Sequence, residues 1–319
     1  MDCNQILNQA LLKQTIPNLD SPLSLLIAGA YIKSEAYPNV LFRIRSLTEH
    51  TKIQVEEINC GLLLEKTKRG DRIRTVRNPV RIIICHIFTF VRLMSHRKRK
   101  NIYIPYPAIF FQFLISLLPS RFKPEFIAID AFVSIYDTVV MDRKLINKDS
   151  RLAKYLLYIE CRAFMSADFV IVDTSCNRDY YSRLFNLSQD RFIPIPLAID
   201  EVIFQPTSYT AHNNNCHVLF VGTMVPLHGI QTIISAIRLL SGQRGISFLI
   251  IGDGQDYSVV SEYSSTNPEN FKWIGNWCHS KNLYEEISEA DICLGIFGST
   301  PKTQRVCPYK IYQRPFVKW

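Results

Sequence analysis

Residues 217–254 read HVLFVGTMVPLHGIQTIISAIRLLSGQRGISFLIIGDG, and this stretch determines the predicted fold. It opens with the short apolar run 217–221, which is typical of a buried strand, and continues through a loop that contains glycines. An amphipathic helix is predicted over 230–240, and a second buried strand over 247–251 ends at Gly252. A strand, a glycine loop, a helix and a second strand form one βαβ unit of a parallel sheet with helices on its faces.

The same alternation extends in both directions along the chain. Further strands are predicted at 23–30, 53–58, 101–106, 125–130, 167–173, 192–195, 270–274 and 290–294. Further helices are predicted at 79–95, 108–118, 149–165, 177–185, 281–288 and 309–313. The sequence therefore predicts an α/β protein of two tandem Rossmann-like domains, an N-terminal domain over 1–206 and a C-terminal domain over 207–319. The polar segment 201–216 is the expected linker, and the second domain is expected to be incomplete, or truncated, at its C-terminus.

Length and composition restrict the class of protein. Of the 319 residues, 47% are apolar and 20% are charged, which is a globular composition and excludes a disordered or collagenous chain. The nine cysteines include no C-x-x-C pair, so a zinc ribbon or disulfide framework is not expected and a reducing cytoplasm is predicted. The first residues do not resemble a signal peptide, and no apolar run reaches the roughly 20 residues of a membrane span.

The net charge of +9 is unevenly distributed. Residues 1–206 hold 28 Lys and Arg against 20 Asp and Glu, and between Lys66 and Lys100 there are twelve basic residues and one acid, Asp71. A basic stripe beside an apolar helix fits an anionic membrane surface or an anionic acceptor, while a solvated basic face is the alternative. Nucleic acid is not expected, because no helix-turn-helix, RNP or zinc-finger pattern accompanies the charge.

The first candidate binding loop follows the predicted strand 217–221. In open α/β sheets, ligands bind beyond the carboxyl ends of the strands, where loops and helix N-termini present backbone N–H groups. Gly222 and Gly229 allow the backbone to approach a phosphate. The Thr223 hydroxyl can donate a hydrogen bond, and a protonated His228 can donate a charged one. An ordinary turn with an exposed histidine is the alternative.

Two further loops carry glycines at strand ends. Gly252, Asp253 and Gly254 form a predicted tight turn, which alone is a weak signal because Asp-Gly turns are common. The loop 295–302, GIFGSTPK, combines two glycines, two hydroxyl groups and Lys302, a set that suits a diphosphate or a sugar hydroxyl. A flexible connection is the alternative for this loop.

Acidic residues gather after the predicted strand 125–130. The segment 127–144 reads IAIDAFVSIYDTVVMDRK, and either Asp130 or Asp137 could orient or deprotonate an acceptor hydroxyl as a general base. Helix capping and salt bridges are the alternative roles for these carboxylates.

Four motifs in the second half follow one another in the order found in a known family. They are VGTMVPLHGIQTIISAIRLL (221–240), FLIIGDGQ (248–255), FKWIGNW (271–277) and LYEEISEADICLGIFGSTPKTQRVCPYKIYQ (283–313). They resemble the donor-binding domain of the family-4-type, group 1 glycosyltransferases, which have the GT-B fold. Upstream, YIECRAFMSADFVIVDTSCNRDYYSRLF (158–185) and FIPIPLAIDEVIFQP (192–206) are also similar to this family, so the resemblance covers nearly the whole chain.

The resemblance implies retaining transfer of a hexose from a nucleoside diphosphate sugar to a polysaccharide or lipid-linked acceptor, with no tightly bound metal and no organic cofactor. Either Lys302 or Lys310 is expected to neutralise the leaving diphosphate. The residues that the resemblance places on the donor are Gly222, Thr223, His228, Gly229, Gly252, Asp253, Gly275, Gly298, Lys302, Lys310 and Gln313.

Some positions depart from the family pattern. The usual basic residue of the first loop is His228, and Arg305 and Gln313 stand where the family has a pair of glutamates. Three functions therefore compete. The first is a cytoplasmic glycosyltransferase that works at the inner face of a membrane. The second is a truncated, inactive relative that only binds nucleotide or membrane, and the third is a nucleotide-sugar epimerase of the same fold.

Overall fold

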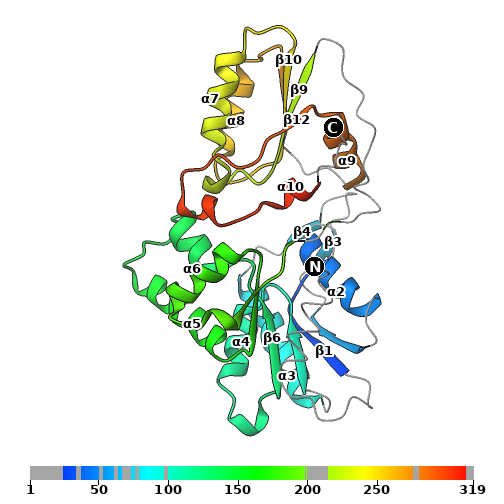
Figure 1. Cartoon of the computed structure of the whole chain (residues 1–319), viewed down its shortest axis with the longest axis vertical. Coiled ribbons are helices and arrows are strands. Elements are labelled where there is room, and N and C mark those ends of the chain that lie inside the picture. Colours follow the sequence, from blue (N-terminus) through cyan, green and yellow to red (C-terminus); the bar gives the residue numbers. More distant parts are fainter. Residues whose placement is uncertain are drawn as a thin grey trace. The chain divides into compact units, whose positions relative to one another are not determined.

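Two compact units make up the chain in its computed structural model (Figure 1). The structure describes residues 24–33, 37–49, 53–60, 64–66, 73–75, 79–96, 100–197, 199, 215–275 and 280–313. The first unit is formed by the described residues up to 136 and by residues 149–196, and the second by residues 137–148 and the described residues from 197 onward. The chain thus passes through the second unit once before it completes the first.

The first unit is built on a six-stranded parallel sheet. Its strands are β1 (Ser24–Gly29), β2 (Gln54–Asn59), β5 (Asn101–Ile104), β6 (Phe126–Asp130), β7 (Phe169–Val172) and β8 (Phe192–Pro194). They are arranged in the order β2-β1-β5-β6-β7-β8, and every neighbouring pair is parallel. A separate antiparallel pair is formed by β3 (Leu64–Lys66) and β4 (Ile73–Thr75).

Helices cover both faces of this sheet because alternate residues of a strand point to opposite sides. Leu26 and Ala28 of β1 belong to one apolar core, and Leu25 and Ile27 belong to another. The first core is closed by α3 (Pro79–Ser95), α4 (Ile109–Ser116), α5 (Arg151–Met165) and α6 (Ser175–Phe185), and the second by α2 (Pro38–Glu49). Side-chain caps fix two helix starts, since Ser150 accepts from the Ala153 N–H and Thr174 accepts from the Asn177 N–H.

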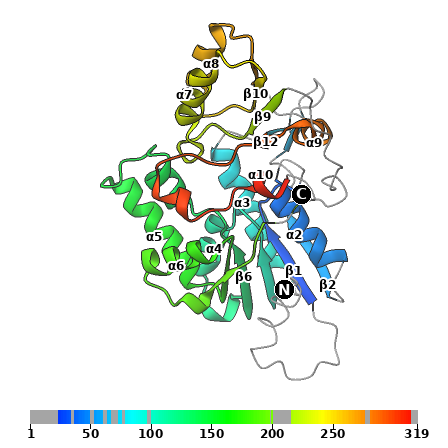
Figure 2. The same ribbon diagram turned by 45° about the horizontal axis from the view of Figure 1, so that its top comes forward.

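The second unit has a four-stranded parallel sheet in the order β11-β10-β9-β12. These strands are β9 (Cys216–Val221), β10 (Ile246–Ile251), β11 (Phe271–Ile274) and β12 (Ile292–Cys293). Two helices, α7 (Ile230–Leu240) and α8 (Tyr257–Ser265), lie side by side on one face, and α9 (Ser280–Glu289) packs on the other (Figures 1 and 2). Shorter helical segments lie at Asp137–Asp142, Pro226–His228, Pro301–Gln304 and α10 (Tyr309–Gln313).

The predicted α/β class is confirmed, and α3, α7 and α10 begin and end where the sequence places them. The sequence analysis predicted neither α2 nor α8, and it missed the β3–β4 pair. The structure also differs from the predicted domain boundary, because residues 137–148 pack with the second unit. Most of the predicted linker, residues 201–214, lies outside the described residues.

None of the helices in the described ranges has both the length and the apolar character that a bilayer span requires.

A buried carboxylate fixes the backbone that leaves β6. Glu160 of α5 is 1% exposed and accepts hydrogen bonds from the Ser134 hydroxyl and from the N–H groups of Ile135 and Tyr136, all at 2.9–3.0 Å. Each of these donors would lose a charged acceptor if the carboxylate were removed.

We expect Glu160→Ala to lower the free energy of unfolding by about 2–4 kcal/mol in urea titrations, because three donors lose their partner. The control is Glu125→Ala, whose side chain is exposed, and its effect should stay near 0.5 kcal/mol or less. Equal effects of the two substitutions would contradict the structural role of Glu160.

Candidate functional site

The loops that follow β9 and β10 are joined through their backbones. The Gly222 N–H donates to the carbonyl of Ile251 at 3.0 Å, and the Met224 N–H donates to the carbonyl of Asp253 at 3.1 Å. Gly252 has φ of +131°, and a Cβ atom there would collide with the carbonyl oxygen of Gly222. The second loop can approach the first this closely only because residue 252 is glycine.

The loop that follows β12 crosses the first loop in the same manner. The N–H groups of Phe297 and Gly298 donate to the carbonyls of His228 and Leu227 at 3.1 and 3.2 Å. A Cβ on Gly229, where φ is +64°, would collide with the Phe297 backbone. Three strand-end loops of the second unit are therefore interlocked, and glycines stand at their crossings.

This interlocking changes the predicted role of the glycine amides. The N–H groups of Gly222, Gly229, Gly252 and Gly298 all donate to carbonyls within the unit, at 2.9–3.2 Å. The expectation that these amides hold a diphosphate is therefore not met, since a donor in a buried backbone hydrogen bond is already used. The glycines instead make room for close packing of the loops.

Two basic side chains meet at Gly222. A Cβ on this residue would lie 2.9 Å from His228 Nδ1 and 3.2 Å from Lys310 Nζ, so a side chain at this position would displace one of them. Lys310 Nζ donates to the carbonyl of Gly295 at 3.0 Å and lies 3.8 Å from the centre of the Phe220 ring. The His228 ring packs edge-on against the same phenyl ring. We call His228 and Lys310, with Gly222 and Phe220, the Lys310 cluster.

Burial controls the charge of this cluster. It lowers the pKa of Lys310 to about 7, and burial together with the nearby Lys310 ammonium lowers the pKa of His228 to about 3. His228 is therefore neutral at pH 7, which corrects the expectation that it supplies a positive charge. No carboxylate in the described ranges forms an ion pair with Lys310, and His228 Nδ1 has no hydrogen-bond partner there.

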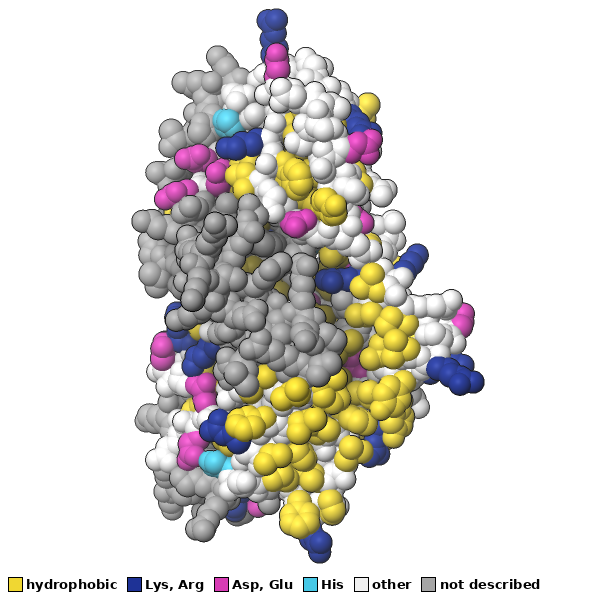
Figure 3. All heavy atoms as spheres, turned by 180° about the vertical axis from the view of Figure 1, so that it is seen from behind, with side chains coloured by type: hydrophobic (Ala, Val, Ile, Leu, Met, Phe, Trp, Pro, Cys, Tyr) yellow, Lys and Arg dark blue, Asp and Glu magenta, His cyan; other side chains and the backbone are white. Residues whose placement is uncertain are grey.

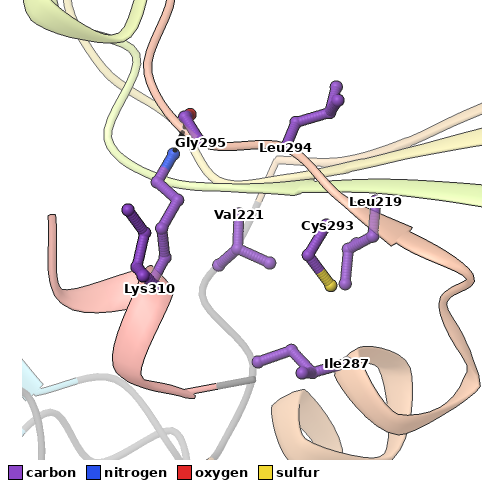
Figure 4. Close-up of a pocket in the computed structure, with 8 residues that line it drawn as sticks. Leu219, Val221, Ile287, Cys293, Leu294, Gly295 and Lys310 are labelled. Atoms are coloured by element: carbon purple, nitrogen blue, oxygen red, sulfur yellow. Dashed lines mark hydrogen bonds between the residues drawn. The ribbon is translucent and has the colours of Figure 1, made fainter. Parts of the chain in front are cut away.

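A small apolar cavity lies beside Lys310 (Figure 4). Its volume is about 120 Å³, and its walls come from β9, β12, α9 and α10. In Figure 4 the Lys310 side chain runs from α10 toward Gly295, and Val221 and Leu219 face Cys293 and Ile287. This volume is below the roughly 300 Å³ at which small-molecule sites begin, so the cavity holds no complete nucleoside diphosphate sugar in this conformation.

The second predicted lysine has a different environment. Lys302 is 7% exposed, and its Nζ lies 3.2 Å from an oxygen of Asp137 and 2.7 Å from the Thr138 hydroxyl. Arg305 donates to the other oxygen of Asp137 at 2.8 Å. Thr300 donates to Asp142 at 2.8 Å, so four contacts hold residues 137–142 against the loop before α10. Of the two predicted lysines, Lys310 is the one without a carboxylate partner in the described ranges.

Neither predicted general base has a free carboxylate. Asp130 is fully buried in the first unit, where Arg43 donates to it at 2.8 Å and the Tyr103 hydroxyl at 3.2 Å. Burial raises the pKa of Asp130, and the Arg43 charge opposes this shift. Asp137 belongs to the second unit and is enclosed by Lys302 and Arg305. These contacts favour the salt-bridge role that the sequence left open.

The remaining predicted residues surround these loops. Thr223 and Asp253 are exposed, and Gln313 is buried at the end of α10. Gly275 lies against the ring of Trp273, whose indole N–H donates to the carbonyl of Gly252 at 3.0 Å. Among the described side chains, no group of three or more histidines, cysteines or carboxylates is placed to hold a metal ion.

Sequence reasoning missed two partners of the site. Phe220 was assigned only to a strand, although its ring supports both basic side chains. The contact of Asp137 with Lys302 joins residues that are far apart in the sequence, and no local pattern indicates it.

The fold of the chain is similar to that of several solved structures. No protein-family model and no curated protein sequence matches the chain. The chain is similar to the catalytic domain of starch synthase IV from Arabidopsis thaliana, bound to ADP and acarbose, with a TM-score of 0.57, 12% identity and coverage of 86% of this chain and 78% of that one. A glycosyltransferase from Rickettsia africae gives a TM-score of 0.52 at 13% identity, with 86% and 72% covered. Anabaena HepE in complex with UDP and glucose gives 0.51 at 11% identity, with 86% and 73% covered.

These similarities show that the chain has the GT-B fold found in group 1-like glycosyltransferases. The predicted fold family is thereby confirmed. The GT-B fold consists of two Rossmann-like domains, and each of the two units corresponds to one of them.

We expect Asp137→Asn to destabilise the second unit by about 3 kcal/mol, because it leaves two buried cations with less compensation. Urea unfolding followed by tryptophan fluorescence provides the measurement, since all three tryptophans of the chain, Trp273, Trp277 and Trp319, fall within the residue range of this unit. The matched control is Asp190→Asn, an exposed residue of the first unit, which should leave that transition unchanged. A similar midpoint for both variants would show that the Asp137 contacts contribute little.

Proposed function

We propose that this protein is a glycosyltransferase that moves a sugar, most simply a hexose, from a nucleoside diphosphate sugar to a saccharide or lipid-linked acceptor with retention of configuration. The GT-B fold supports the class of enzyme. One observation carries the donor assignment: the amine of the half-buried Lys310, without a carboxylate partner in the described ranges, lies beside Gly222 at the carboxyl end of β9.

A diphosphate fits the Lys310 cluster for electrostatic reasons. An amine whose pKa is lowered to about 7 by desolvation has lost much of its hydration, and a nearby anion would favour its protonated, charged form. The first turn of α7 begins after its N-cap Gly229 and has no side-chain cap, so its N–H groups would be available to phosphate oxygens. Charge that develops on the leaving diphosphate would be stabilised by these fixed donors, which is usually the largest catalytic contribution.

His228 would act in this proposal as a neutral hydrogen-bond donor. Its Nδ1 has no partner in the described ranges and lies beside Gly222, where the ligand would approach. Thr223, Gly298 and Gln313 remain proposed contacts to the sugar or the nucleoside, and Lys302 is proposed to hold the loop before α10 in place. The reaction proposed here involves no metal or organic cofactor.

We expect Lys310→Met to weaken the binding of UDP, GDP or ADP by about 1–3 kcal/mol in titration calorimetry at pH 6.5, because a charged hydrogen bond is lost. The control is Lys272→Met, an exposed lysine of β11, which should bind as the wild type does. An unchanged affinity in Lys310→Met would remove the donor-site assignment.

The advantage of the wild type over Lys310→Met should also depend on pH. The free amine, with a pKa of about 7, loses its proton as the pH rises, whereas the diphosphate complex requires it protonated. We therefore expect the ratio of the two affinities to fall by up to about tenfold per pH unit above pH 7. A ratio that is constant between pH 6 and pH 9 would contradict the assigned role of Lys310.

Sugar transfer itself is tested by turnover of the donor. The full chain is incubated with UDP-, GDP- and ADP-sugars, with and without oligosaccharide acceptors, and release of the nucleoside diphosphate is measured. Release that depends on the acceptor supports a transferase. Tight nucleotide binding without any release would support the competing function, a relative that only binds nucleotide.

A further inference from the structure

The helix α3 is apolar on two opposite sides. Cys85 and Leu93 are buried against the sheet, whereas Ile84 and Phe88 are 54% and 52% exposed. The exposed apolar positions recur with helical spacing and form a continuous stripe of Ile83, Ile84, Ile87, Phe88 and Val91. A surface helix of a globular protein normally carries polar residues on this side.

Two neighbouring helices continue the stripe. α3 contacts α4, α4 contacts α5, and all three contribute residues to the same core on one face of the first unit's sheet. The sides of these three helices that face away from the sheet therefore lie on the same side of the unit. Leu117 at the end of α4 and Leu152, Tyr155 and Tyr158 of α5 are all more than half exposed. Figure 3 shows apolar side chains gathered on this unit. We call these residues and the α3 stripe the outer apolar face.

The charges on these helices have one sign. α4 has no ionisable residue, and the exposed ionisable side chains described on α3 and α5 are Arg92, Arg151 and Lys154. The single acid of the three helices, Glu160, is buried and accepts hydrogen bonds from inside the unit. The exposed ionisable side chains described on these three helices are therefore all cationic.

We propose that the outer apolar face binds the surface of a bilayer that contains anionic lipid. Isoleucine and phenylalanine side chains would enter the acyl boundary, the exposed tyrosines would lie at the headgroup level, and the three cations would meet lipid phosphates. The sequence had indicated a membrane contact through the basic residues between Lys66 and Lys100. Most of those side chains lie outside the described residues, and the proposal rests on the three helices.

The charge pattern favours a lipid surface over a second copy of the chain. A twofold dimer through this face would bring Arg92, Arg151 and Lys154 of one copy close to the same cations of the other. Like charges that face each other in an interface are unfavourable, whereas an anionic lipid surface compensates all of them. This proposal stands independently of sugar transfer, since it involves no residue of the Lys310 cluster.

Flotation of the full chain with vesicles tests the proposal. We expect the protein to float with vesicles of phosphatidylcholine and phosphatidylglycerol, less with phosphatidylcholine alone, and less at high salt. The double variant Ile84→Glu, Phe88→Glu should lower the vesicle-bound to free ratio by at least about tenfold. The matched control, Leu239→Glu with Tyr257→Glu, places the same charges on exposed apolar positions of the second unit and should leave binding unchanged.

A variant on a second helix tests the proposal independently, in case the α3 variant fails to fold. Tyr155→Glu on α5 should also reduce binding severalfold, with an unchanged circular dichroism spectrum. Three results would overturn the proposal: wild-type binding by both variants, equal binding to vesicles with and without anionic lipid, or a wild-type dimer that the α3 variant converts to a monomer with no effect on vesicle binding.

Discussion

The second unit depends on the interlocking of its strand-end loops. Backbone hydrogen bonds join Gly222 to Ile251 and Phe297 to His228, and the crossings are close enough that a Cβ on Gly252 or Gly229 would strike the neighbouring backbone. Beside these crossings, the side chains of His228 and Lys310 lie against Gly222, the residue that follows β9. Their burial, and hence their shifted pKa values, follows from the close approach of the loops.

The distribution of counter-charges then separates three nearby cations into two roles. Asp137 compensates Lys302 and Arg305 and holds residues 137–142 against the loop before α10. Lys310 instead donates to the Gly295 carbonyl and lies over the Phe220 ring, and these groups stabilise a cation less than a carboxylate does. This difference is the reason why Lys310, and not Lys302, is proposed as the cation that an entering anion would contact.

Much of the fold could be predicted because its signals are local. The apolar strands, the amphipathic α7 and the glycines that follow the strands are all visible within short windows of sequence. The site was predicted less well. Lys310 was one of two candidate lysines, and only the contact between Asp137 and Lys302 separates them. The neutral state of His228 follows from its burial, and the exposure of Ile84 and Phe88 on α3 follows from tertiary packing. No short stretch of sequence indicates any of these three features.

The central claim is that the amine of Lys310 is desolvated in the free protein and binds an anionic ligand. The pKa of Lys310 tests this claim most directly. The protein labelled with ¹³C at lysine Cε can be titrated by NMR, with Lys310→Met to assign the signal. The account predicts a pKa of about 7 in the free protein and a marked rise when UDP or GDP is bound. A pKa near the ordinary lysine value in the free protein, or no change with either nucleotide, would contradict it.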